Sequence, residues 1–303
     1  MSIRADGSTI RRARWDDLAL LLLLAAIWSS SFMFIKVAVV TVPPLTLAVM
    51  RLALASTLLA AYVWRTGVRI RLTSQVLFAF AFVGCFGNAL PFTLIGWGEQ
   101  TVSSGLAAIL MGAMPLATLI LAHYFTQDEP FQRRRLLGLL IGLTGLAVLV
   151  GWDALSDLGG AWIAQMAILS AAVSYAVNTV FTRRNLHIPG PILAAGAISA
   201  GTIMLLPLAL LLESPWQIQP TSSALWSIAA LGVLSTALAT LLYFHLVRAI
   251  GATAFSQVNH MIPIMGVLWG ALFLGERPGV RELLALTLIL VGVWLVNHSA
   301  RRA

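Results

Sequence analysis

Residues 111–130 read MGAMPLATLILAHYFTQDEP, and residues 259–278 read NHMIPIMGVLWGALFLGERP, 148 positions further along the chain. The matching positions in the two stretches are Pro115 with Pro263, Phe125 with Phe273, Asp128 with Glu276 and Pro130 with Pro278. Similarity at a fixed offset predicts that the chain contains two copies of one structural unit.

The composition predicts a protein that crosses a membrane many times. Of the 303 residues, 59% are hydrophobic and only 10% are charged, and the mean hydropathy is +0.92. The basic residues that give the net charge of +8 cluster in short gaps between apolar runs, where we expect them to set the orientation of the spans in the membrane. We therefore expect no nucleic-acid partner. The lone Cys85 cannot form an internal disulfide, and we expect no cofactor and no metal site.

Ten apolar runs are long enough to span a membrane as helices, since about 20 residues cross its hydrocarbon core. The first run follows a basic stretch but has no cleavage site, so it predicts a retained span rather than a signal peptide. The expected spans are 18–40, 44–64, 74–97, 101–123, 134–151, 160–182, 191–212, 223–248, 253–275 and 281–298.

The arginines orient these spans with both termini in the cytoplasm. Fifteen basic residues would then lie on the inner side, namely Arg4, Arg11, Arg12, Arg14, Arg65, Arg69, Arg71, Arg133, Arg134, Arg135, Arg183, Arg184, Arg248, Arg301 and Arg302. Two would lie on the outer side, Arg277 and Arg281. We therefore expect a multi-pass protein of the bacterial inner membrane.

The repetition covers both halves of the chain. WSSSFMFIK at 28–36 aligns with YAVNTVFTR at 175–183, and Leu136 onward aligns with Leu283 onward. Because five spans per half is an odd number, the second half is inverted relative to the first. The prediction is an all-α membrane protein of two inverted five-helix repeats, residues 1–152 and 153–303, around a central cavity.

This pattern resembles the drug/metabolite transporter superfamily, and within it the EamA-type bacterial exporters. The resemblance rests on Trp28-x-x-x-Phe32 in the first span and on LFLGERP at 272–278, with a degenerate copy, YFTQDEP, at 124–130. The overall appearance is most similar to exporters of aromatic amino acids. The resemblance implies a cavity lined by spans 1 to 4 and 6 to 9, with spans 5 and 10 packed behind them.

Lys36 and Arg51 are the two clear cases of a basic residue inside a predicted span, and such residues usually serve function because their burial is costly. The alternative for both is that the side chain extends to the outer headgroups. Glu99 and Glu213 lie at span ends, and no acidic residue lies near the middle of a span. This disfavours lipophilic cations as substrates, and proton antiport would need His123, His245 or His260 as the carrier.

An amino-acid zwitterion fits this charge pattern, because a cation can bind its carboxylate while aromatic faces or amides hold its ammonium. The candidate substrate-binding residues are Trp28, Ser31, Lys36, Arg51, Asn88, Trp97, Gln100, Tyr175, Asn178, Tyr243, Gln257, Asn259 and Trp269. Two alternatives stay open: Trp97 is typical of an interfacial belt, and the amides could bond helix to helix. Specificity is expected where the repeats differ, as at Asn259 opposite Met111 and Trp269 opposite Leu121.

Pro115 and Pro263 occupy equivalent positions in spans 4 and 9, and we expect them to be hinges; static kinks are the alternative. In span 5, Gly138-x-x-x-Gly142 predicts a close helix approach.

The predicted function is export of small neutral, aromatic or hydrophobic, amino acids by alternating access, with facilitated diffusion favoured over proton antiport. The alternatives are export of another small metabolite or drug, and a membrane-embedded enzyme. The enzyme is disfavoured because the spans contain no convergent catalytic residues. The expected partners are a small-molecule substrate and the lipid bilayer, and the protein is expected to be a monomer.

Overall fold

The computed structural model describes residues 15–68, 70–125, 133–150, 160–185 and 188–299. Within them, each of the ten expected spans is helical, and eight helices are long and apolar enough to cross a membrane. The shorter apolar helix Val258–Leu274 accompanies them. Residues 126–130 of the first motif copy and the boundary expected at 152 and 153 lie outside the described residues.

The first five spans are built from eight elements. These are α1 (Trp15–Ala38), α2 (Pro44–Thr66), α3 (Ser74–Gly84), η1 (Cys85–Ala89), α4 (Leu90–Glu99), α5 (Ser104–Met111), α6 (Met114–Phe125) and α7 (Arg133–Val150). The second five spans and one short turn, η2, form the rest. These are α9 (Gly160–Asn185), α10 (Gly190–Leu212), η2 (Pro215–Gln217), α11 (Ser222–Ala230), η3 (Leu231–Leu238), α12 (Ala239–Phe255), α13 (Val258–Leu274) and α14 (Val280–Ser299).

Local sequence explains where several helices begin and end. α2 starts at Pro44, where a missing N–H costs nothing, and is followed by Gly67 in the left-handed conformation (φ 65°). Ser103 and Thr221 cap α5 and α11, because their hydroxyls accept hydrogen bonds from the backbone of Leu106 and Ala224.

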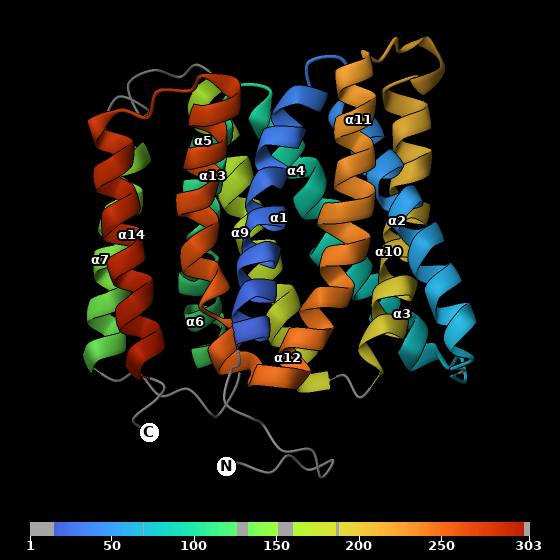
Figure 1. Cartoon of the computed structure of the whole chain (residues 1–303), viewed down its shortest axis with the longest axis horizontal. Coiled ribbons are helices and arrows are strands. Elements are labelled where there is room, and N and C mark those ends of the chain that lie inside the picture. Colours follow the sequence, from blue (N-terminus) through green and yellow to red (C-terminus); the bar gives the residue numbers. More distant parts are fainter. Residues whose placement is uncertain (1–14, 69, 126–132, 151–159, 186–187, 300–303) are drawn as a thin grey trace.

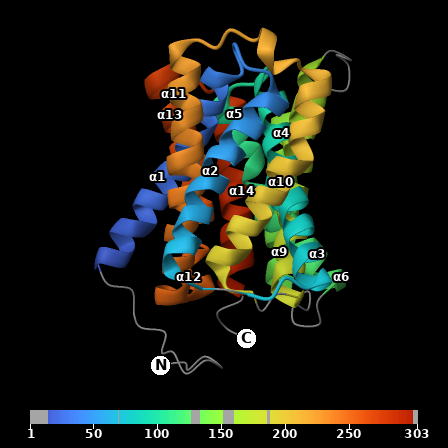
Figure 2. The same ribbon diagram turned by 90° about the vertical axis from the view of Figure 1, so that its right-hand side faces the viewer.

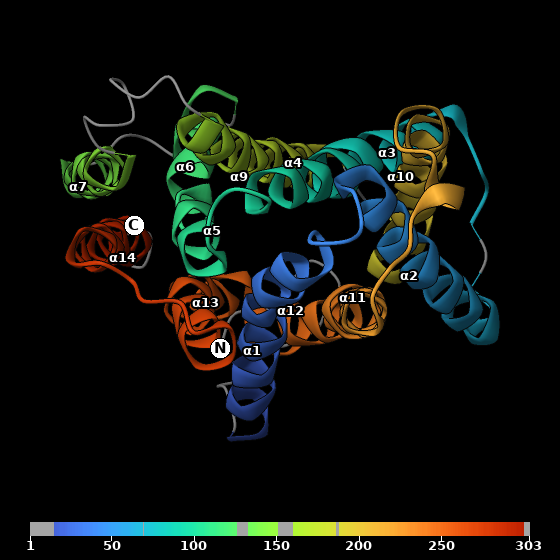
Figure 3. The same ribbon diagram turned by 90° about the horizontal axis from the view of Figure 1, so that it is seen from above.

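The helices run side by side as one bundle, with α1 starting and α14 ending at the same face (Figure 1). α7 and α14 pack chiefly on each other at one end of the bundle, as the resemblance implied for spans 5 and 10 (Figure 3). A Cβ placed on Gly138 would lie 2.6 Å from the carbonyl oxygen of Gly292, and one placed on Gly292 would lie 2.7 Å from the nitrogen of Gly142. The close approach predicted from the glycine spacing is confirmed.

The two halves interleave instead of forming two separate bodies. The most extensive helix contacts all join one half to the other: α7 with α14, α2 with α10, α1 with α13, and α4 with α9. Figures 2 and 3 show α2 and α10 packed side by side. Each of α1 and α9, the first helices of the two halves, packs against spans of the opposite half. Neither half therefore forms a body of its own, and each is held in place by helices of the other.

A π-helical turn interrupts the third span of each half. η1 lies between α3 and α4, and η3 lies between α11 and α12. Shifting η1 by 148 residues places it inside η3, so the inverted repeat extends to this irregularity. Such turns are rare and frequently occur at functional sites.

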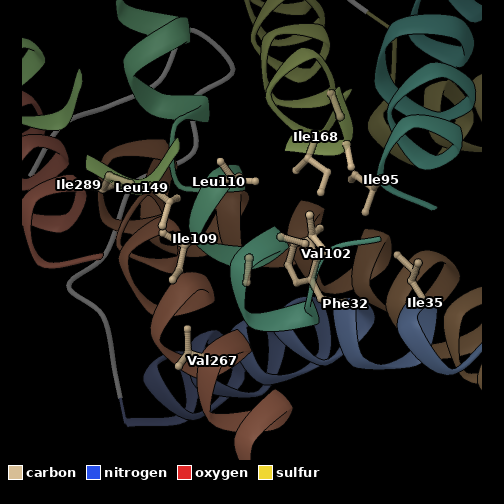
Figure 4. Packing of buried hydrophobic residues seen from close by; sticks show 14 of the residues in the cluster. Phe32, Ile35, Ile95, Val102, Ile109, Leu110, Leu149, Ile168, Val267 and Ile289 are labelled. Carbon is tan, nitrogen blue, oxygen red and sulfur yellow. The ribbon is translucent and has the colours of Figure 1, made fainter. Parts of the chain in front are cut away.

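The main hydrophobic core joins elements of both halves. Figure 4 shows Phe32 of α1, Val102 after α4, Ile168 of α9 and Val267 of α13 in one cluster of buried side chains. This packing fixes the positions from which polar side chains project inside the bundle.

Candidate functional site

Arg51 lies about 10 Å along α2 from its outer end, at 1.5 Å of rise per residue. The side chain is only 5% exposed. Its Nε donates a hydrogen bond to the hydroxyl of Thr236 in η3 at 2.8 Å, and its guanidinium stacks 3.7 Å from the ring centre of Phe92 in α4. Arg51 therefore does not extend to the headgroups. A neutral hydroxyl and an aromatic face hold its charge inside the bundle.

Tyr175 and Asn178 of α9 lie near the π-helical turn of span 3. The charge of Arg51 acts on the Tyr175 phenol. A Cβ placed on Gly87 would lie 2.8 Å from the Asn178 amide nitrogen, so α9 approaches η1 closely there. Asn88 donates from its amide to the carbonyl oxygen of Val83 within its own helix. The structure thus brings the predicted residues of spans 2, 3 and 6 into one region.

A second group of predicted residues joins α1 to α12 and α13. The rings of Trp28 and Tyr243 are 6.2 Å apart, and Phe255 meets Trp28 edge to face at 6.1 Å. Trp269 donates from Nε1 to the hydroxyl of Ser29 at 2.8 Å. These contacts give Trp28 and Trp269 defined partners inside the bundle, away from an interfacial belt.

Lys36 binds backbone instead of extending to the headgroups. Its ammonium donates to the carbonyl oxygens of Glu99 and Val102, at 2.6 and 2.7 Å. These carbonyls end α4 and lead into α5, so Lys36 satisfies acceptors that a helix end leaves free. A role for Lys36 in substrate binding stays a prediction.

We call the face formed by the loops at 39–43, 100–103, 213–221 and 275–279 the outer face, because the arginine distribution places the opposite face in the cytoplasm. Two carboxylates join helix ends there. Glu276 accepts hydrogen bonds from the backbone nitrogens of Ser104 and Gly105, and Glu213 accepts from those of Leu45 and Thr46. Each carboxylate caps the start of a helix in the other half.

The remaining predicted binding residues are spread over several elements. Trp97 is 43% exposed on α4, and Gln100 is exposed just after that helix. Ser31 is buried and donates to the carbonyl oxygen of Trp28. Gln257 and Asn259 are half-buried at the start of α13.

The two predicted hinge prolines differ in their surroundings. Span 4 is broken at Gly112 and Ala113, just before Pro115, as expected where a proline removes a helix hydrogen bond. In contrast, α13 runs through Pro263. A Cβ on Gly112 would lie 3.3 Å from Cγ of Pro263, so the break in span 4 rests against the proline of span 9.

The sequence did not reveal that Glu99 is wholly buried. Its exposed fraction is 0%, and among the described residues neither carboxylate oxygen has a hydrogen-bond partner. The charges of Lys36, Glu276 and Arg51 all act on it. The sequence placed Glu99 at the end of a span and carried no signal of its burial.

Comparison with known proteins gives the family. The model of the EamA-like transporter family matches this chain twice, at residues 17–151 and 162–298. A solved crystal structure superposes with a TM-score of 0.66 over 96% of this chain and 99% of its own, at 20% identity, and thus shares the fold.

Three relatives match over most of their length. An "Uncharacterized inner membrane transporter YedA" of Escherichia coli is 29% identical over 90% of this chain and 88% of its own. A "Probable terminal-alkyne amino-acid exporter" of Streptantibioticus cattleyicolor is 28% identical over 92% of both chains. A "Probable amino-acid metabolite efflux pump" of Salmonella typhimurium is 27% identical over 91% of this chain and 93% of its own.

Proposed function

The chain belongs to the EamA-like transporter family, and we propose that it exports small neutral amino acids, aromatic or hydrophobic ones in particular, by alternating access. A transporter of this family is a multi-pass membrane protein and not an enzyme. The name of the YedA relative supports the inner membrane as its location, and two other relatives are named as exporters of amino acids or their metabolites.

The buried guanidinium of Arg51 carries this proposal. Its described partners are the Thr236 hydroxyl and the Phe92 ring, and neither of them neutralises its charge. A substrate carboxylate would do so, with a charge-assisted hydrogen bond in a site shielded from water. The aromatic rings of Trp28, Tyr175 and Tyr243 then suit an apolar side chain or an ammonium group.

Transport into and out of liposomes tests the proposal. Purified protein in proteoliposomes loaded with phenylalanine, tryptophan, threonine or methionine should release the aromatic and hydrophobic amino acids fastest. Arg51→Ala should reduce this release. Transport of organic cations with no release of amino acids would instead support the alternative, an exporter of other metabolites or drugs.

A further inference from the structure

The starting observation is the carboxylate of Glu99 at the outer end of α4. It is fully buried, and among the described residues both of its oxygens lack a hydrogen-bond partner. Burial of an ionised carboxylate without a partner costs several kcal/mol. The arrangement in this structure therefore accommodates the neutral acid and disfavours the anion.

The charged groups around Glu99 are engaged elsewhere. From α1, Lys36 donates to the backbone carbonyls of Glu99 and Val102 and not to the carboxylate. From α2, Arg51 is held by Thr236 and Phe92. After α13, the Glu276 carboxylate is held by two backbone N–H groups of the α5 start.

The other elements packed on α4 add little charge. α9 contributes the phenol of Tyr175, which interacts with Arg51. η1 contributes the thiol of Cys85, and α5 contains no acidic or basic residue. No group in this surrounding donates a hydrogen bond to the Glu99 carboxylate.

Hydrogen bonds between helix ends enclose Glu99 at the outer face. Lys36 joins α1 to the connection between α4 and α5, and Glu276 joins the end of α13 to α5. Glu213 joins the end of α10 to α2, and the hydroxyls of Thr41 and Thr221 lie 3.4 Å apart. We call this arrangement the closed outer face. Because Glu99 has no exposed surface, water can reach its carboxylate only if the elements around it move apart.

We propose that Glu99 is a proton-binding site of the outer face, neutral while the outer face is closed and ionised when it opens to water. On opening, the Glu99 O–H bond breaks and the proton passes to water outside; on closing, a proton from outside returns to the carboxylate. The proton enters and leaves on the same side, so the cycle moves no net proton across the membrane. The proposal rests on the alternating access of the proposed function and not on its substrate.

The expected pH dependence has a definite sign. The closed outer face holds one proton more than the open one, so a lower external pH favours closure and a higher external pH favours opening. A single proton changes the ratio of the two states by at most about tenfold for each pH unit. Outward release of substrate should therefore depend on external pH without requiring a pH gradient.

Infrared spectroscopy of the purified full chain tests the protonation directly. At neutral pH the wild type should show the C=O stretch of a protonated carboxylic acid, and Glu99→Gln should lack it. Glu282→Gln serves as the matched control, because Glu282 lies at the same face and binds the backbone of Gly279. Absence of the band in the wild type, or its persistence in Glu99→Gln, would overturn the proposal.

A distance measurement tests the coupling to opening. Spin labels are attached at Val40→Cys and Gln219→Cys, in a Cys85→Ala background, to measure a distance across the outer face. Both positions are exposed, and neither residue takes part in the hydrogen bonds named above. The population of the longer distance should rise with pH in the wild type and Glu282→Gln, and should stay constant in Glu99→Gln. Glu99→Asp should keep a pH response, because it keeps a carboxyl group.

The same pH response in Glu99→Gln as in the wild type would refute the coupling. Neither measurement needs a substrate, so failure of amino-acid export in liposomes would leave both results intact. Conversely, a pH-independent outer face would leave amino-acid export untouched and reject the role of Glu99 alone.

Discussion

Asn88 and Thr236 occupy equivalent positions of the two repeats, 148 residues apart, and each donates a hydrogen bond to the carbonyl oxygen five residues earlier in its helix. The acceptors are Val83, at 3.1 Å, and Leu231, at 2.8 Å. Both bonds stabilise π-helical turns, whose wider spacing brings side chains to backbone acceptors that a regular helix keeps occupied. Thr236 additionally accepts from Arg51, and the position 147 residues after Arg51 is the buried, apolar Ile198. A symmetric framework thus holds a cation that only one half supplies.

The first prediction concerns Arg51. Replacement by alanine should weaken apparent substrate affinity by about 10- to 150-fold, since a hydrogen bond to a charged group contributes about 1.5–3 kcal/mol. Arg51→Lys should recover part of the affinity, because it keeps the charge but loses the planar contact with Phe92. Concentration-dependent export from proteoliposomes gives the measurement.

Folding must be separated from binding in this test. Arg65→Ala, at the exposed inner end of the same helix, is the matched control and should leave affinity unchanged. Thr236→Val removes the hydroxyl that orients Arg51 and should produce a smaller loss of affinity than Arg51→Ala. If Arg51→Ala lowered only the unfolding temperature and left affinity intact, Arg51 would serve structure alone.

The second prediction concerns the cap that Glu276 provides. Glu276→Ala should lower the free energy of unfolding by about 2 kcal/mol, because two backbone N–H groups of the α5 start lose a charged acceptor. Glu282→Ala removes an acceptor for the single N–H of Gly279 and should cost less than about 1 kcal/mol. Thermal unfolding in detergent compares them, and equal effects would contradict the assignment.

Span number, repeat and orientation were predictable because hydrophobic length and arginine placement are properties of single segments. The burial of Glu99 was not, since it depends on helices from distant parts of the chain that pack around α4. The π-helical turns were also hidden, because CFGNA and LGVLSTAL have the hydrophobicity of any span. The interleaving of the halves was not predicted, because the hydrophobicity of a span determines its length but does not determine which other spans it packs against.

The third prediction separates two of the candidate substrate-binding tryptophans, Trp28 and Trp97. Trp28→Ala should reduce export of aromatic amino acids about 2- to 10-fold more than export of threonine, since an aromatic pair contributes about 0.5–1.5 kcal/mol. Trp28→Phe should keep most of the preference, because a ring still faces Tyr243 and Phe255. Trp97→Ala should leave the ratio unchanged, because Trp97 lies exposed on α4. Export of a mixed amino-acid load gives these ratios, and an equal effect at Trp97 would rule out the role of Trp28.

The last prediction concerns the two prolines at equivalent positions. Pro115→Ala restores the N–H that a continuous span 4 requires, so it should favour closure of the break at Gly112 and Ala113 and slow turnover more than it weakens binding. Pro263→Ala should have a smaller effect on turnover, because α13 already runs through this position. Gly112→Ala places a methyl group 2.9 Å from the Ile109 carbonyl oxygen and 3.3 Å from the Pro263 ring, and it should impair transport even with both prolines present. Initial export rates at saturating substrate, compared with binding of the same substrate in detergent, distinguish the effects. If Pro115→Ala left turnover unchanged, the break would be a static kink. A change in the geometry of a hinge must change the rate of conformational exchange.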